Sequence, residues 1–415
     1  MSIRLKFSLV PGRRIFSGIK WNSQTAELMV KNLAEEMEYS CFQQKNLLVV
    51  QVCAEGYLWF QWEKRRYLGE SQTNLAGPGF HRAVIAFLEK LADKEKLSVC
   101  VEDRTGYFLK RDFLAMRQEY FYQWFSDLIE LVSHWDGGGE PYFCWPGAIY
   151  LPECQEGRLI THNRSYSFQE IRNIIHSGMS GAFAKDFFIW NEIEKDARFY
   201  RNSALALLQQ FCYFMPSERS AQDSRINQAI IRDLETALSM DRTLPFPQKE
   251  YLEVCALDKH TPADLRDTVS MGKDFFVGCH KNLVFHKIES MSFAVPGNYL
   301  FDPKGKNFMD LYYDGQEYGG HEYYVYLATF ENRPAEFKSL WFEQGTRKEL
   351  LDFDLGEVKV RTAFYEPERE NEKLLYKMST QALYKAQRLN ILLTSRTPID
   401  RDWALKLVKT IKIIE

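Results

Sequence analysis

The stretch Arg388-LNILLTSRTPIDRDWALKLVKTIKII-Glu415 closes the chain and decides the fold of its last third. In its first part, Leu389, Ile391 and Leu393 occupy alternate positions. Alternation at a period of two residues places them on one face of a β-strand, and that face is wholly apolar. We therefore expect a strand that is buried on this face and partly buried on the other.

The second part of the same stretch predicts a short amphipathic helix. Thr397 can cap its start, Pro398 suits its first position, and Asp400 falls in its first turn. There the carboxylate faces the positive end of the helix dipole. The apolar stripe at helical spacing consists of Trp403, Leu407 and Ile411, with Ala404 and Val408 beside them.

Further strands are predicted upstream of this ending. They cover residues 291–295, 307–313, 321–330, 357–363 and 373–379, and one helix at 335–346 lies among them. Several of the gaps have hairpin length, so the expected arrangement is an antiparallel sheet with helices packed on it.

This order of elements resembles the PsbP/DcrB-like superfamily. Its members open with a strand resembling Met291-SFAVPGNYL-Phe301 and end on a strand and helix resembling Leu389 to Ile414. The resemblance covers roughly residues 280–415 and rests on the pattern rather than on an invariant motif. It implies a binding or adaptor domain without shared catalytic residues. Some relatives are similar to chaperones for toxins that bacterial secretion machines export, and others are accessory subunits.

The composition is that of an ordinary globular protein. A chain of 415 residues predicts two or three domains, and 45% hydrophobic with 26% charged residues allows a sizeable core. The formal net charge of -3 leaves no electrostatic footprint for nucleic acid or for an anionic membrane. Aromatic residues make up 15% of the chain and can fill cores or anchor protein interfaces.

Cysteine usage and the absence of long apolar runs indicate a cytoplasmic protein. Residues 1–14 do not have the apolar run of a signal peptide, and no stretch approaches the roughly 18 to 20 apolar residues that span a bilayer. The eight cysteines form no Cys-x-x-Cys pair. Cys53, Cys100 and Cys212 lie in apolar segments, where we expect buried, reduced thiols.

Residues 1–109 predict a ferredoxin-like α+β domain. The expected order is β-α-β-β-α-β, with strands at 5–10, 47–53, 57–68 and 97–102 and helices at 24–37 and 78–91. The two middle strands would form a hairpin across Ala54-Glu55-Gly56. This fold hosts many unrelated functions, so it indicates no activity.

Residues 110–260 predict a mainly helical region, followed by a linker at 260–275 and the α+β domain at 275–415. Helices are expected at 111–134, 184–214 and 221–240. Ser167 and Glu170 form a capping box that opens a shorter helix ending at 175. A small hairpin is expected to join residues 148–151 to 158–162. The whole chain is thus predicted to be an α+β protein of three parts.

The most suggestive local feature is Asn74-LAGPGFHR-Ala83, a Gly-Pro-Gly loop that opens a helix. The backbone N–H groups at such a start can hold a phosphate or a carboxylate, with His81 and Arg82 nearby. The candidate anion- or ligand-binding residues are therefore Gly77, Gly79, His81 and Arg82. The loop lacks the Gly-Lys-Ser/Thr ending of a P-loop. A tight loop before a helix that begins with proline is the preferred explanation of the motif.

Two acidic features are candidates, one for a catalytic role and one for ligand binding. Glu102 and Asp103 are adjacent in a strand and point to opposite faces, so Asp103 is predicted to shape the turn or cap the next segment. Trp135-DGGGE-Pro141 can be a ligand loop carrying Asp136 and Glu140, although glycines that end a helix explain it as well.

Two further clusters favour structural explanations. Cys279 and His280 lie too far along a strand from His286 to share one metal ion with it. The basic run 64–66 lies near Trp59 and Trp62, which can stack on single-stranded nucleic acid. The run is short and the net charge is negative, so a solvated strand end is the preferred interpretation.

The sequence contains no catalytic motif, and we predict a non-catalytic protein-binding protein that uses no cofactor or metal. It would be an adaptor, a chaperone or an immunity-type partner, possibly linked to a bacterial toxin or secretion system. The expected partner is another protein rather than nucleic acid or a membrane, with a small-molecule ligand also possible. The alternative is an enzyme or small-anion-binding protein that uses the loop from Gly77 to Arg82. It predicts a deep pocket where His81, Arg82 and a carboxylate converge.

Overall fold

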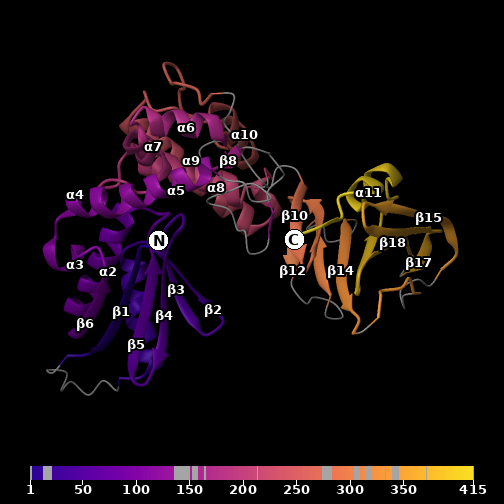
Figure 1. Ribbon diagram of the computed structural model, residues 1–415, viewed down its shortest axis with the longest axis horizontal. Helices are drawn as coiled ribbons and strands as arrows, with labels where there is room; N and C mark the ends of the chain where they lie inside the picture. Colours follow the sequence, from indigo (N-terminus) through magenta and orange to yellow (C-terminus); the bar gives the residue numbers. More distant parts are fainter. Residues whose placement is uncertain are drawn as a thin grey trace. The chain divides into compact units, whose positions relative to one another are not determined.

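The computed structural model describes residues 2–12, 21–134, 150–151, 158–162, 165–212, 214–272, 283–302, 309–314, 320–331, 333–338, 345–370 and 372–414. The fold is a mixture of helices and antiparallel sheets, which confirms the predicted α+β class. The chain forms two compact units. The first comprises residues 1–144, 154–211 and 224–277, and the second comprises 145–153, 212–223 and 278–415. Each unit has its own hydrophobic core (Figure 1).

The first unit is built on an antiparallel sheet of six strands with the spatial order β2-β3-β4-β5-β1-β6. The strands are β1 (Arg4–Pro11), β2 (Ser40–Gln44), β3 (Leu47–Cys53), β4 (Gly56–Glu63), β5 (Arg66–Gln72) and β6 (Leu97–Asp103). Leu5, Phe7 and Leu9 of β1 are buried on one face. The helices α1 (Ser23–Glu36) and α2 (Pro78–Glu95) contact each other and bury their apolar sides in the same core.

The predicted four-strand ferredoxin-like order is wrong, because six strands form. The segment predicted as one strand at 57–68 is a hairpin of β4 and β5. It turns at Lys64 and Arg65, whose φ angles are 46° and 65°. Two successive positive φ values match the twist of a tight hairpin, but they usually require Asn, Asp or Gly. The strand β2 was also not predicted.

Helices make up most of the rest of the first unit. They are α3 (Tyr107–Lys110), α4 (Phe113–Met116), the π-helix η1 (Arg117–Tyr122), α5 (Gln123–Ser133), α6 (Phe168–His176), α7 (Ser180–Phe187), α8 (Ala197–Gln210), α9 (Ala221–Met240) and α10 (Gln248–Asp258). The predicted helices at 111–134 and 221–240 are confirmed, and so is the capping box of Ser167 and Glu170. The sheet and the helices α1 to α8 share one core, in which Phe80, Phe121 and Phe187 are all buried.

Two predictions for this region are wrong. The helix expected at 184–214 is interrupted, because Trp190 exchanges backbone hydrogen bonds with Ala76 and Gly79. The hairpin expected between 148–151 and 158–162 does not form. Instead β7 (Tyr150–Leu151) pairs with β10, and β8 (Arg158–Ile160) pairs with β9 (Ser165–Ser167). In both cases a partner far along the chain overrides the local pattern.

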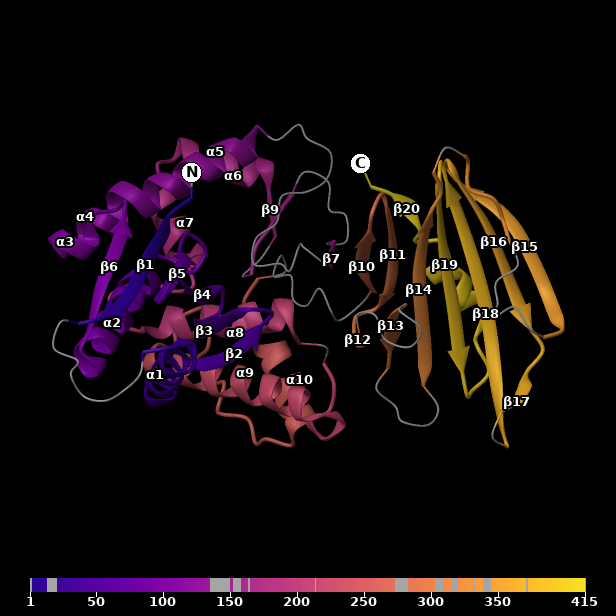
Figure 2. The same ribbon diagram turned by 90° about the horizontal axis from the view of Figure 1, so that it is seen from below.

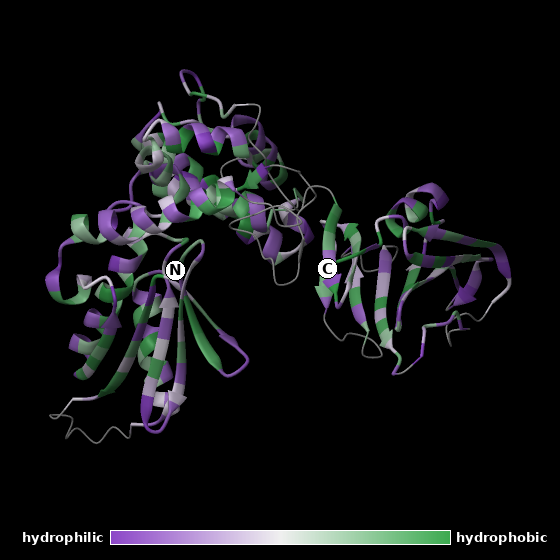
Figure 3. Ribbon diagram, viewed as in Figure 1, coloured by the Kyte–Doolittle hydropathy of each residue, from purple (hydrophilic) through white to green (hydrophobic). Residues whose placement is uncertain are grey.

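The second unit contains two antiparallel sheets. The larger has the order β12-β13-β14-β19-β18-β16-β15, with β17 paired to β18, and the smaller has the order β20-β11-β10-β7 (Figure 2). The strands are β10 (Leu283–Ile288), β11 (Met291–Pro296), β12 (Leu300–Asp302), β13 (Asp310–Tyr313), β14 (His321–Thr329), β15 (Arg347–Leu355), β16 (Val358–Tyr365), β17 (Glu368–Glu370), β18 (Lys373–Tyr384), β19 (Gln387–Ser395) and β20 (Lys412–Ile413). Hydrophobic and hydrophilic bands alternate along several of these strands (Figure 3).

The closing strand and helix are present, with a different helix start. The strand β19 is buried at Leu389, Ile391 and Leu393, as predicted. The helix α11 (Arg401–Val408) begins after Asp400, whose carboxylate accepts a hydrogen bond of 2.8 Å from the Trp403 backbone N–H. The predicted cap at 397 and first position at 398 are therefore wrong. Ile399 packs against the core, and residues 396 and 397 form a bend before it.

The helix predicted at 335–346 is not found in its described part. Residues 335–338 are irregular, and the Ala335 N–H donates to the carbonyl of Lys385 over 2.8 Å. Residues 339–344 lie outside the described part of the chain. The strand β15 that follows was not predicted. The strands predicted at 291–295, 321–330 and 357–363 are confirmed as β11, β14 and β16.

Candidate functional site

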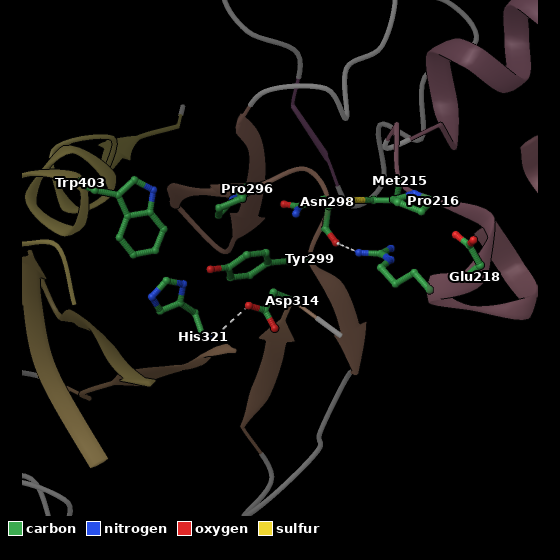
Figure 4. A pocket seen from close by; sticks show the side chains of 10 residues that line it. Met215, Pro216, Glu218, Pro296, Asn298, Tyr299, Asp314, His321 and Trp403 are labelled. Carbon is green, nitrogen blue, oxygen red and sulfur yellow. Dashed lines mark hydrogen bonds between the residues drawn. The ribbon is translucent and has the colours of Figure 1, made fainter. Parts of the chain in front are cut away.

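The second unit contains an open pocket with a volume of about 680 Å³. Its walls come from the β11–β12 turn, the β13–β14 connection, the first turn of α11 and the segment before α9 (Figure 4). The residues that line it are Met215, Pro216, Glu218, Arg219, Pro296, Asn298, Tyr299, Asp314, His321 and Trp403. We refer to it as the Tyr299 pocket.

Three short structures hold the aromatic side chains of the Tyr299 pocket in place. Tyr299 follows a tight turn in which its N–H donates to the Pro296 carbonyl over 3.0 Å. The His321 N–H donates to the Asp314 carboxylate over 3.1 Å, where β14 begins. Trp403 lies in the first turn of α11, which the Asp400 carboxylate caps. Each aromatic residue is thus fixed by its own backbone hydrogen bond.

His321 and Trp403 form a flat wall of the pocket. Their ring centroids lie 4.7 Å apart with an interplanar angle of 26°, which is a stacked geometry. Burial lowers the pKa of His321, and the nearby Asp314 carboxylate only partly opposes this effect. The ring is therefore neutral at pH 7, since an ordinary histidine has a pKa near 6.5. A neutral stacked pair suits an apolar or planar group of a ligand.

Tyr299 supplies the pocket's most informative polar group. Its side chain is only 9% exposed, and its hydroxyl has no hydrogen-bond partner among the described residues. The hydroxyl points into the pocket beside His321 (Figure 4). Burial, with a smaller contribution from Asp314, raises the pKa of Tyr299, so the hydroxyl stays protonated. A buried hydroxyl without a partner costs roughly 1 to 3 kcal/mol, which a ligand that hydrogen-bonds to it would recover.

One wall of the pocket is an irregular segment of the chain itself. Met215 and Pro216 precede the turn η2 (Ser217–Arg219) and face the pocket. The Arg219 guanidinium donates to the main-chain carbonyl of Asn298 over 2.9 Å and to the Asp223 carboxylate over 2.7 Å. The edge of this pocket therefore already holds a polypeptide segment through a charge-assisted hydrogen bond.

The loop predicted to bind an anion has a different environment. The Gly79 N–H donates to the Trp190 carbonyl over 2.9 Å, and Pro78 has no N–H to offer. Arg82 donates to the Ile193 carbonyl and lies beside Glu194, whereas His81 points into the core. The structure thus does not bring the four candidate residues together around a ligand. The helix does begin with proline, as the alternative explanation of the motif requires.

Close packing explains both glycines of this loop. Gly77 has a φ angle of 104°, and a Cβ there would lie 2.7 Å from the Trp190 carbonyl oxygen and 2.8 Å from Phe188. A Cβ at Gly79 would overlap the Trp190 ring and the Glu192 carbonyl oxygen. Only glycine allows the segment after α7 to approach the start of α2 so closely.

His81 belongs to a buried polar network. Its Nδ1 lies 3.0 Å from the Thr73 hydroxyl, and its Nε2 lies 3.3 Å from Asp103 and 3.4 Å from the Thr105 hydroxyl. The side chains of His81 and Asp103 are 0% and 2% exposed. An acid, a histidine and a hydroxyl in series resemble a catalytic triad, but a substrate cannot reach groups that are this deeply buried. The network therefore has a structural role.

Asp103 shapes the turn after β6, as predicted. Its carboxylate accepts hydrogen bonds of 2.8 Å from the N–H groups of both Thr105 and Phe108. Burial alone would raise the pKa of Asp103. The hydrogen bond and the charge interaction with His81 outweigh burial, together with the hydrogen bonds from Phe108 and Thr105. They hold the pKa of Asp103 well below its ordinary value.

The remaining candidates divide into three groups. Cys53 and Cys212 are buried as predicted, but Cys100 is exposed because it lies on the outer face of β6. The basic run 64–66 is exposed at the β4–β5 turn, as a solvated strand end requires. The loop 135–141, with its two acidic residues, and the pair Cys279 and His280 lie outside the described residues.

Three further observations concern metal binding, membrane crossing and similarity to known proteins. Among the described residues, no group of three or more His, Cys, Asp or Glu side chains is arranged to hold a metal ion. The helices of the described part of the chain include none with the length and apolarity that crossing a membrane requires. Comparisons with protein-family models, with curated proteins and with solved structures found no match.

Proposed function

We propose that this chain is a non-catalytic polypeptide-binding protein whose C-terminal unit holds a short extended segment of a partner in the Tyr299 pocket. One observation carries this proposal. The buried hydroxyl of Tyr299 has no partner among the described residues, in a pocket lined by proline and aromatic side chains. A partner that supplies a hydrogen-bonding group there removes the cost of the buried hydroxyl.

An extended polypeptide provides both kinds of contact that this pocket offers. A main-chain carbonyl can accept the Tyr299 hydroxyl, and an adjacent bulky side chain can cover the wall of His321 and Trp403. Tyrosine, tryptophan and methionine are enriched at the centres of protein interfaces for this combination of apolar area and a polar tip. The hydrogen bond from the Arg219 guanidinium to the main-chain carbonyl of Asn298 is an example of how a main-chain group is bound at the edge of this pocket.

The lining of the pocket favours binding over covalent catalysis. Serine, threonine, cysteine and lysine do not occur among its described lining residues. These are the usual nucleophiles of enzymes that act through a histidine. His321 therefore has none of these four nucleophiles beside it among the described lining residues, and we propose that it contributes a stacking surface.

The resemblance to the PsbP/DcrB-like superfamily supports the same role, because that superfamily implies a binding or adaptor domain. We therefore extend the proposal to an adaptor, chaperone or immunity-type protein, with an exported toxin or a component of its secretion system as the partner. A cytoplasmic location suits this role and agrees with the free thiols of Cys53 and Cys255.

A peptide selection with the full-length protein tests the proposal. The immobilised chain is panned against random dodecapeptides on phage, and the affinities of the selected synthetic peptides are measured by fluorescence anisotropy. We expect selected peptides to lose about tenfold or more in affinity for Trp403→Ala, which removes half of the stacked wall. Tyr326→Ala is the matched control, since Tyr326 is 48% exposed and lies outside the pocket. A failure to enrich any peptide, or equal binding to Trp403→Ala, would reject the proposal.

A further inference from the structure

A second cavity, of about 480 Å³, lies within the first unit. One wall is a face of α8 on which Phe199, Ser203 and Leu207 follow one another at intervals of four residues. The start of β2, the end of β3 and the residues Arg232 and Asp233 of α9 also line it. We refer to this cavity as the Lys195 cavity.

Lys195 places a positive charge over aromatic rings in this cavity. Its ammonium nitrogen lies 5.1 Å from the ring centroid of Phe199, 5.4 Å from that of Trp190 and 5.8 Å from that of Tyr39. No ion pair of Lys195 is found among the described residues. Aromatic faces attract a cation without neutralising it, so the charge remains available to an anion.

Three other charged groups line the cavity. Arg232 and Asp233 form an ion pair at 3.0 Å, and the Asp233 carboxylate also interacts electrostatically with Lys195. Glu38 also lines the cavity, but it is exposed, so water screens its charge. Lys195 is therefore the lining cation without a hydrogen-bonded ion pair among the described residues.

Ser203 adds a hydrogen-bond donor to the same cavity. The residue is only 6% exposed, and its hydroxyl has no partner among the described residues. Most buried hydroxyls are hydrogen-bonded, so an orphaned one beside a cavity indicates a group that the cavity receives. An ammonium and a hydroxyl can both donate to the oxygens of one carboxylate.

Apolar residues form the rest of the chamber. Val52, Leu207 and Phe211 line it beside the two donors. Its volume falls within the range of roughly 300 to 1,000 Å³ that is typical of small-ligand pockets, which combine apolar walls with a few convergent polar groups. A bare inorganic anion would leave these walls without contacts.

We infer that the Lys195 cavity binds a small organic carboxylate with an apolar body. The carboxylate accepts from the Lys195 ammonium and from the Ser203 hydroxyl, and the body packs against Leu207 and Phe211. This site is separate from the Gly77 loop, whose backbone donor at Gly79 is already bonded to Trp190. It is also independent of the proposed peptide function, since different residues form it.

Isothermal titration of the full-length protein tests this inference with phenylacetate, phenylacetamide and inorganic phosphate at one ionic strength. We expect phenylacetate to bind at least tenfold more tightly than the neutral amide, because only the acid has a charge for Lys195. Phosphate, which lacks an apolar body, is expected to bind more weakly than phenylacetate. Equal affinities for the acid and the amide, or no binding of phenylacetate up to about 10 mM, would overturn the inference.

Variants locate the binding. Lys195→Met is expected to weaken phenylacetate binding by about tenfold or more, and Lys185→Met is the matched control because Lys185 is exposed on α7 and does not line the cavity. Ser203→Ala removes an unpaired hydroxyl, so it should fold normally and bind phenylacetate about threefold to tenfold more weakly. If both cavity variants bind as the wild type does, the cavity is not the site and the inference fails.

Discussion

The start of α2 and the Tyr299 pocket beside α11 differ in whether their buried polar groups have hydrogen-bond partners. At α2 the Gly79 N–H is bonded to Trp190, and both ring nitrogens of His81 have partners. In the pocket, the Tyr299 hydroxyl has no partner within the described part of the chain. The first region carries the conspicuous sequence motif, and the Gly79 N–H and the His81 ring are satisfied internally. The second has no motif, and it retains a group that a ligand can satisfy.

The difference teaches that a conspicuous glycine motif can be explained by close packing, whereas our proposed site rests on a buried hydroxyl without a partner among the described residues. The glycines at α2 exist for close packing, and the polar residues beside them complete a buried network. Substitutions at α2 should therefore cost stability. Substitutions in the pocket should cost binding rather than stability.

The largest effect is expected for Gly79→Ala. The new Cβ overlaps the Trp190 ring, and overpacking of this kind typically costs 1–3 kcal/mol and sometimes more. We expect the free energy of unfolding to fall by about 3 kcal/mol in urea denaturation. Gly181→Ala is the control, because its Cβ would meet nothing closer than 3.9 Å. It should be neutral or slightly stabilising. Equal effects of the two changes would show that close packing does not explain the loop.

The next effect is expected for Asp103→Asn. The change weakens the hydrogen bonds to His81 and to two backbone N–H groups, and we expect a loss of about 2 kcal/mol at pH 7. The folded-state pKa of Asp103 lies below its unfolded value of about 3.9, so its contribution is complete above that value. The contribution is lost as the pH falls from about 4 toward the folded-state pKa.

Urea denaturation at several pH values measures this contribution. The difference in stability between the wild type and Asp103→Asn should shrink steadily below about pH 4. A difference that stays constant down to pH 2 would mean that the carboxylate does not have the lowered pKa that its hydrogen bonds require.

A smaller effect is expected at the cap of α11. Asp400→Ala removes the hydrogen bond to the Trp403 N–H and should lower the free energy of unfolding by about 1 kcal/mol. Thr397→Ala should cost less, because Thr397 lies outside the helix and bonds only to Ser395 among the described residues. If thermal unfolding shows a larger loss of stability for Thr397→Ala than for Asp400→Ala, the helix begins after Thr397, as the sequence predicts.

The sequence predicted the parts of the fold that depend on local periodicity. The strands β11, β14 and β19 and the helix α9 follow from the spacing of apolar residues. The β4–β5 turn was not predicted, because Lys64 and Arg65 adopt positive φ values that usually require Asn, Asp or Gly. The break after α7 depends on hydrogen bonds to residues that precede α2, so no local signal marks it.

The candidate site was beyond prediction for a related reason. Tyr299, His321 and Trp403 come from three separate parts of the sequence, and only the folded sheet brings them to one pocket. Trp403 was predicted as part of the apolar stripe of the closing helix. Its other neighbour, the ring of His321, depends on where β14 begins. A missing hydrogen-bond partner is a property of three-dimensional packing, and no sequence pattern reports it.

Tyr299→Phe is expected to cost no stability. This change removes only a hydroxyl without a partner among the described residues. The free energy of unfolding should therefore not fall, and it should rise by up to roughly 1 to 3 kcal/mol, which is the cost of the buried hydroxyl. Urea denaturation of the full chain measures it, and a loss of about 2 kcal/mol or more would indicate that the hydroxyl has a structural partner.

The affinity of Tyr299→Phe for the peptides selected on the wild type tests the central claim most directly. If the orphaned hydroxyl marks the site, fluorescence anisotropy should show about tenfold weaker binding in a variant that is at least as stable as the wild type. Unchanged peptide affinity in this stably folded variant would contradict the account.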